Sequence, residues 1–183
     1  DKTSGATPSS FSAHALSRTM EENISADQLS SELDLIWGGA SASVNKENAA
    51  ENGFTYISTE TEMDALKVGS RSFGQFSYDD LYNYRDDNDT PRIAEMTEKA
   101  IELLSRDKDG FVLMVEGSQV DFAAHATDPA GIVSEFLAFD RAVGVAMDFA
   151  KKDGNTTVVV LPDHGTSGVT LGKFGYSKGY RKG

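Results

Sequence analysis

Three carboxylates and two imidazoles follow two apolar segments in the second half of the chain. Glu116, Asp121 and His125 come after the first apolar segment, and Asp163 and His164 come after the second. The chain contains no cysteine, and carboxylate oxygen and imidazole nitrogen are the usual ligands of zinc where no sulfur is offered. The pattern indicates a metal site built from oxygen and nitrogen ligands.

The spacing within this set suits shared ions. Asp121 and His125 are four residues apart, so helical turns would place both on one face, where one ion could lie about 2.0–2.2 Å from each ligand atom. Asp163 and His164 are adjacent, and neighbours in extended chain point to opposite sides. This pair can share an ion only if the chain bends there, which the flanking proline and glycine favour.

Each of these residues also has an ordinary structural interpretation. Glu116 can be a solvated residue at a strand end, Asp121 a helix cap, His125 an exposed helical residue, and Asp163 with His164 a polar turn. Two of only three histidines in the chain belong to the set. The joint occurrence keeps the metal site open beside the ordinary alternatives.

The elements that must position these residues form a strand, helix, strand pattern. Residues 111–115 are five consecutive apolar residues, typical of a strand buried on both faces. A long helix is predicted from Asp128-Pro129 to Gly154, and residues 156–161 predict the next strand. Such a crossover makes its strands parallel and brings their carboxyl ends, where ligands bind, to one edge. The sequence therefore predicts an α/β fold with a mostly parallel central sheet flanked by helices.

The remaining segments add elements to the same domain. Thr7-Pro8 predicts the N-cap and first turn of a helix that continues to Arg18. Residues 33–37 and 54–57 predict strands, the first ending in a tight turn at 38–39, with helical segments between them. Pro91 predicts the start of a helix that 107–110 ends. Residues 78–90 are acidic and polar and are expected to be a surface excursion, within one α/β domain over 1–183.

Composition excludes several classes of protein. The formal net charge of −12 argues against a nucleic-acid-binding surface, because phosphate backbones are bound by clustered Lys and Arg. No apolar run approaches the roughly 18 residues of a membrane span. The chain starts at Asp1 without an export segment, so we expect a processed, truncated or excised N-terminus.

Several motifs together resemble one enzyme family. Glu-Gly-Ser-Gln-Val-Asp at 116–121, His125, and Asp163-His164 after a valine-rich segment are similar to the alkaline phosphatase family. Ala6-Thr7-Pro8 with His14 and Arg18, then Gly38-Gly39, 51–66 and 93–100, resemble it in the same order. The likeness covers essentially the whole chain. It implies the central part of an alkaline-phosphatase-like fold, with 170–183 at the start of a variable crown-like region.

The resemblance also implies cofactors, ligands and a phosphate-binding group. It implies two Zn²⁺ and one Mg²⁺ held by six residues: Thr7 and Glu116 for magnesium, Asp121 and His125 for one zinc ion, and Asp163 and His164 for the other. Magnesium prefers hydroxyl, carboxylate and water oxygens. Arg18 would bind phosphate through its two-pronged guanidinium, although outside the family it would be an ordinary surface arginine.

The activity implied by the resemblance is hydrolysis of phosphomonoesters through a phosphoserine intermediate. Two zinc ions about 3.5–4 Å apart would stabilise the attacking and leaving oxygens. Phosphomonoesters and inorganic phosphate are the implied ligands. A homodimer in the periplasm or outside the cell is the implied setting.

Some family features have no counterpart in the chain. The nucleophilic serine, a metal-bridging aspartate and a last zinc histidine are missing, and Ser9 and Ser10 do not occupy the nucleophile motif. This 183-residue segment is therefore expected to lack activity when it stands alone. Alternatives are a related metal-dependent phosphodiesterase, sulfatase or mutase, and a catalytically inert metal-binding domain. Thr7 and Glu116 favour the phosphatase because they would supply its third metal site.

Overall fold

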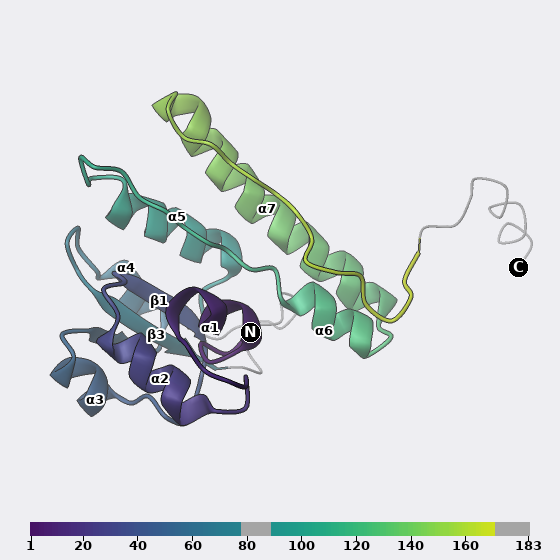
Figure 1. Cartoon of the computed structure of the whole chain (residues 1–183). Coiled ribbons are helices and arrows are strands. Elements are labelled where there is room, and N and C mark those ends of the chain that lie inside the picture. The colour runs from purple at the N-terminus through teal and green to yellow at the C-terminus, as the bar shows by residue number, and fades with distance from the viewer. Residues whose placement is uncertain (78–88, 171–183) are drawn as a thin grey trace, which may run out of the picture.

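A parallel sheet forms the centre of the computed structural model, which describes residues 1–77 and 89–170. Its strands are β1 Leu35–Gly39, β2 Thr55–Ile57 and β3 Ser72–Phe76, hydrogen-bonded in the order β1-β3-β2. Both pairs are parallel, and helices lie on both faces of the sheet (Figure 1). The predicted α/β class with a parallel sheet is confirmed.

Two apolar clusters fill the spaces between the sheet and its helices. One cluster lies on the side of α2 Glu21–Ser30 and α3 Lys46–Glu51. It consists of Leu29, Ile36, Val44, Ala49, Phe54 and Phe73. The other involves α4 Glu60–Asp64 and α5 Ile93–Leu104. It consists of Ile57, Met63, Leu66, Phe76 and Leu103. Successive strand residues serve opposite clusters, as the pleat requires.

The first two predicted strands are confirmed with shifted ends, and the helix expected between them is α3. The tight turn expected at 38–39 is wrong, because both glycines belong to β1. Gly38 admits a close backbone neighbour there: a Cβ on Gly38 would lie 2.9 Å from the Asp1 carbonyl oxygen. Lys2 pairs with Gly39 in a parallel bridge. The strand β3, α2 and α4 were not predicted.

The first helix is shorter than predicted. The helix α1 spans Ala6–Ser12 and has Gly5, not Thr7, as its N-cap. Ala13 is extended, with φ −146°, and the next backbone N–H, that of His14, donates to Asp27 Oδ2 at 2.8 Å. Serine hydroxyls that bond to helical carbonyls compete with helix propagation, and Ser12 Oγ donates to Pro8 O at 2.7 Å. Arg18 therefore lies in a loop.

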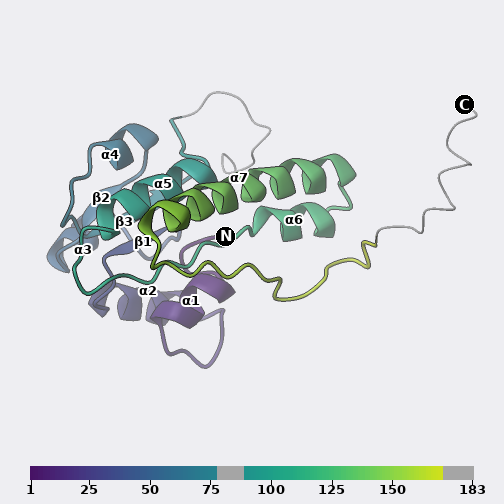
Figure 2. The same ribbon diagram turned by 90° about the horizontal axis from the view of Figure 1, so that it is seen from above.

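Three helices follow Pro91 in the described part of the chain. The predicted helix after Pro91 is α5, which ends at Leu104, before the expected 107–110 turn. The helices α6 Gln119–His125 and α7 Pro129–Asp153 follow, and α7 packs against both α5 and α6. Asp128 caps α7 through Ala130 N, and Gly154, with φ 77°, ends it as expected. The views in Figures 1 and 2 show the segment after α7 running back alongside that helix.

The predicted strands at 111–115 and 156–161 are wrong. Both segments are without strand structure, so α7 does not connect two strands of one sheet. A strand needs a neighbouring backbone to complete its hydrogen bonds, and neither segment has a ladder partner among the described residues. Val112 is 90% exposed and Leu161 is 69% exposed.

Two expectations fall largely outside the described residues. They are the surface excursion at 78–90, of which only residues 89 and 90 are described, and the crown-like start at 170–183, of which only residue 170 is described. No helix in the described part of the chain is long and apolar enough to cross a membrane.

Candidate metal centre

Asp121 and His125 lie on one face of α6, as their spacing predicts. Asp121 Oδ2 is 3.6 Å from His125 Nε2. The aspartate is half-buried and the histidine is exposed. The helix forms the first half of a candidate metal centre, with one carboxylate and one imidazole turned toward each other.

Asp163 and His164 form a second pair in the segment after α7. Asp163 Oδ2 is 3.3 Å from His164 Nε2. The backbone N–H of His164 donates to Asp163 Oδ1 at 2.9 Å, which bends the chain and turns two adjacent side chains to the same side. The expected bend is present, although no strand precedes it.

Thr166 joins the two pairs and was not predicted from the sequence. Its hydroxyl donates to Asp121 Oδ1 and lies 3.3 Å from His164 Nδ1. This contact crosses 45 residues of sequence. The signal available in the sequence is a hydroxyl two residues after His164, within the same polar turn.

The separations within both pairs suit zinc. Two ligand atoms about 2.0–2.2 Å from one tetrahedral ion lie about 3.3–3.6 Å apart, and the two carboxylate–imidazole separations are 3.6 and 3.3 Å. The donor types are those that zinc accepts without sulfur. Among the described residues no group of three or more acidic or histidine side chains gathers around one point, so each pair supplies a partial ligand set.

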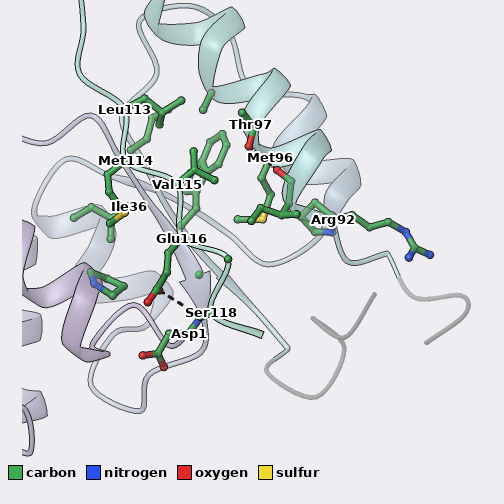
Figure 3. A pocket seen from close by; sticks show the side chains of 18 of the residues that line it. Asp1, Ile36, Arg92, Met96, Thr97, Leu113, Met114, Val115, Glu116 and Ser118 are labelled. Carbon is green, nitrogen blue, oxygen red and sulfur yellow. Dashed lines mark hydrogen bonds and ion pairs between the residues drawn. The ribbon is translucent and has the colours of Figure 1, made fainter. Parts of the chain in front are cut away.

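Glu116 lies apart from these pairs, at the edge of a cavity. Its Oε2 is 3.9 Å from the Asp1 amino group, which also donates to Ser118 Oγ. Figure 3 shows Glu116 pointing toward Asp1 and Ser118.

The cavity has a volume of about 450 Å³ and lies between β1, α5 and residues 112–119. Ile36 and Met96 line it from opposite elements (Figure 3). Gln119 also lines it, is 8% exposed, and has no hydrogen-bond partner for either amide atom within the described part of the chain. A buried amide without a partner is uncommon in proteins. The cavity therefore combines apolar walls with unused hydrogen-bonding capacity.

The other predicted site residues are not brought to the metal-ligand pairs. Thr7 is on α1, next to Pro8, which lines the cavity with Glu116. Arg18 is exposed in the loop between α1 and α2. Across residues 1–77 and 89–170, no hydrogen bond or ion pair joins Thr7, Glu116 or Arg18 to the pairs at Asp121 and His164. Their roles stay predictions.

Comparison with known proteins identifies a family. The alkaline phosphatase family matches residues 39–180. Alkaline phosphatase 3 of Bacillus subtilis is 36% identical over 183 residues, an alignment that covers 93% of this chain and 39% of that protein. The chain thus spans about two fifths of the length of this relative.

Solved structures agree with the sequence comparison. A cold-active alkaline phosphatase from a psychrophilic Shewanella sp. matches with a TM-score of 0.74 and 30% identity, covering 82% of this chain and 38% of that one. A mutant of TAB5 alkaline phosphatase with Mg bound in its M3 site matches with a TM-score of 0.65 and 34% identity, over 84% of this chain and 47% of that one. These likenesses confirm the predicted fold type.

Proposed function

We propose, since this chain belongs to the alkaline phosphatase family, that the whole protein is a metal-dependent hydrolase of phosphomonoesters. Its substrates would be phosphomonoesters and its product inorganic phosphate. The cofactors in this proposal are two Zn²⁺ and one Mg²⁺. The family supports phosphatase chemistry, and the donor pairs of this chain support the metal dependence.

One observation carries the proposal. Two carboxylate–imidazole pairs from distant parts of the sequence have separations that suit zinc, and the Thr166 hydroxyl links them. Helix packing of α6 on α7 and a polar turn hold the pairs on the same side of the fold. Isolated surface acids and histidines would have no reason to share one half-buried hydroxyl partner.

Five residues would act as metal ligands in the proposed site. When bound, two zinc ions of this kind stabilise the attacking and leaving oxygens of phosphoryl transfer. In the proposal Asp121 and His125 hold one ion, and Asp163 and His164 hold the other. Glu116 would supply a carboxylate oxygen for magnesium.

Two further residues complete the proposed site. Thr7 would add a hydroxyl oxygen to the magnesium ligands. Arg18 would bind two oxygens of the phosphoryl group, which needs its exposed loop to reach the pairs. A phosphoserine intermediate also belongs to the proposal. Ser9 and Ser10 are poor candidates for that serine, because their hydroxyls donate to the carbonyls of Ala6 and Thr7.

Hydrolysis of a chromogenic phosphomonoester by the full protein tests the proposal. We expect turnover that a chelator removes and that zinc with magnesium restores. Asp121→Asn should lower kcat/KM by about 100-fold or more, because it weakens a metal that contributes several kcal/mol. Asp148→Asn is the matched control, since Asp148 is an exposed acid on α7 whose ion pair, within the described residues, is with the exposed Lys151. Equal activity of both variants would contradict the proposal.

The alternatives predict different substrates. A phosphodiesterase or sulfatase would prefer a diester or a sulfate ester of the same chromophore, and a mutase would move phosphate within one substrate. An inert metal-binding domain would bind zinc without turnover of any of them.

Location and assembly are further parts of the proposal, supported by family membership alone. We expect the protein in the periplasm or outside the cell, and we expect a homodimer. Cell fractionation and light scattering of the full protein test these two statements.

A further inference from the structure

The Thr166 hydroxyl lies at the contact between the two ligand pairs. It reaches Asp121 on α6 and His164 in the turn after α7. Thr166 and Asp121 are both half-buried, whereas His125, Asp163 and His164 are exposed. The contact between the Thr166 hydroxyl and the Asp121 carboxylate is therefore the part of the candidate centre that is best shielded from solvent. It joins α6 to the turn that follows α7.

The direction of the hydrogen bonds follows from donor and acceptor capacity. An ionised carboxylate only accepts, so Thr166 donates its single proton to Asp121 Oδ1. Toward His164 Nδ1 the hydroxyl can then only accept. The same nitrogen lies 3.3 Å from the carbonyl oxygen of Gly165, which also only accepts. Both contacts offer an acceptor to a proton on Nδ1 of His164, so they support that tautomer once a metal ion takes the lone pair of Nε2.

This arrangement leaves the metal-facing atoms unused. With its proton on Nδ1, a neutral imidazole has a lone pair on Nε2, and that atom is 3.3 Å from Asp163 Oδ2. Thr166 binds Oδ1 of Asp121 and leaves Oδ2, which faces His125 Nε2 at 3.6 Å. In the pair of Asp163 and His164, two acceptor atoms then face each other at a distance that one zinc ion can bridge, and the separation between Asp121 Oδ2 and His125 Nε2 also suits one zinc ion.

We propose that Thr166 is a positioning residue that organises both ligand pairs of the metal centre. Its hydroxyl orients the Asp121 carboxylate and holds His164 in the tautomer that offers Nε2 to an ion. Because it contacts one residue of each pair, it also fixes the distance between the two pairs. This inference rests on the proposed zinc dependence and adds a residue that is not itself a zinc ligand.

Zinc affinity of the full protein, measured by competition with a chromogenic chelator, tests the inference. Thr166→Val keeps the shape of the side chain and removes the hydroxyl, and Thr166→Ser keeps the hydroxyl. Loss of a group that orients a metal ligand typically lowers metal affinity 10–100-fold, so we expect about that loss for valine and a change within about threefold for serine. The matched control is Thr157→Val, at an exposed threonine of the adjoining segment.

The outcomes separate this inference from the proposed function. Wild-type zinc affinity in Thr166→Val, or equal losses in the valine and serine variants, would overturn the role of the hydroxyl. If Asp121→Asn then still abolished zinc binding, the proposed function would stand without Thr166. A full-length wild-type protein that binds no zinc would overturn both. Urea unfolding of each variant shows whether a loss of affinity reflects loss of the folded state.

Discussion

Gly131→Ala is expected to disturb the packing of α7 on α6, the helix that carries Asp121 and His125. Gly131 lies in the first turn of α7. A Cβ at this position would be 2.7 Å from Asp128 Oδ2 and 3.1 Å from the Cβ of Ala123 on α6. The added methyl group must therefore displace the capping carboxylate, the neighbouring helix, or both.

The magnitude follows from three opposing contributions. Overpacking destabilises by about 1–3 kcal/mol. Displacement of Asp128, which accepts from Ala130 N and Gly131 N at 3.1 and 3.0 Å, removes a cap that contributes about 0.5–2 kcal/mol. Alanine in place of glycine favours the helix by about 1 kcal/mol. The middle of each range leaves a net loss of about 2 kcal/mol in the free energy of unfolding.

The same substitution elsewhere in α7 supplies the control. A Cβ at Gly144 has no atom within 4 Å, so Gly144→Ala should stabilise the protein by about 0.5–1 kcal/mol. Urea unfolding followed by circular dichroism measures both variants. The two should differ by about 3 kcal/mol. Equal stabilisation by both substitutions would refute the close packing of α7 on α6.

Two further perturbations test the sheet and its surroundings. Phe73→Ala removes a fully buried ring that packs edge-on against Phe54, so urea unfolding should show a loss of about 3–5 kcal/mol in the free energy of unfolding. The control Phe136→Ala, at a ring that is 59% exposed, should change that free energy by no more than about 1 kcal/mol. Similar losses in the two variants would contradict the assigned core. The backbone N–H of Ser58 donates to Glu62 and lowers the pKa of that carboxyl below its ordinary value of 4.5. A lowered pKa in the folded state gives stability that is present above pH 4.5 and is lost as the pH falls through the pKa of the folded state. The difference in the free energy of unfolding between wild type and Glu62→Gln should therefore shrink on acidification. A difference that grows on acidification would contradict the hydrogen bond from Ser58.

Strands with apolar sequences could be predicted, and the central strand could not. Residues 33–37 predict β1 because apolar side chains dominate, whereas β3 carries Ser72, Gly74 and Gln75 among its five buried residues. These polar groups are acceptable in the core because they have partners: Ser72 Oγ accepts from Trp37 Nε1 at 2.9 Å, and Gln75 Nε2 donates to Ser41 O at 3.3 Å. Such partners come from distant segments and leave no local pattern.

At 111–115 and 156–161 the sequence predicts strands that the structure does not contain, whereas β3 is a strand that the sequence did not predict. Their apolar runs are typical of strands buried on both faces. Periodicity reports what a segment could bury, but a ladder also needs the N–H and C=O groups of a neighbour. No such neighbour pairs with either segment in the described part of the chain.

The candidate site could also be predicted only in part from the sequence. Helical spacing predicted that Asp121 and His125 face each other, and the flanking proline and glycine predicted the bend at Asp163. Thr166 could not be predicted, because its partner Asp121 is 45 residues away. The places of Thr7, Glu116 and Arg18 in the site rest on family resemblance and stay predictions.

Anomalous diffraction at the zinc edge, from crystals of the full protein grown with zinc and magnesium, tests the central claim most directly. We expect two zinc peaks about 3.5–4 Å apart, one between Asp121 and His125 and the other beside Asp163 and His164. Zinc bound elsewhere, or no zinc at either pair, would contradict it.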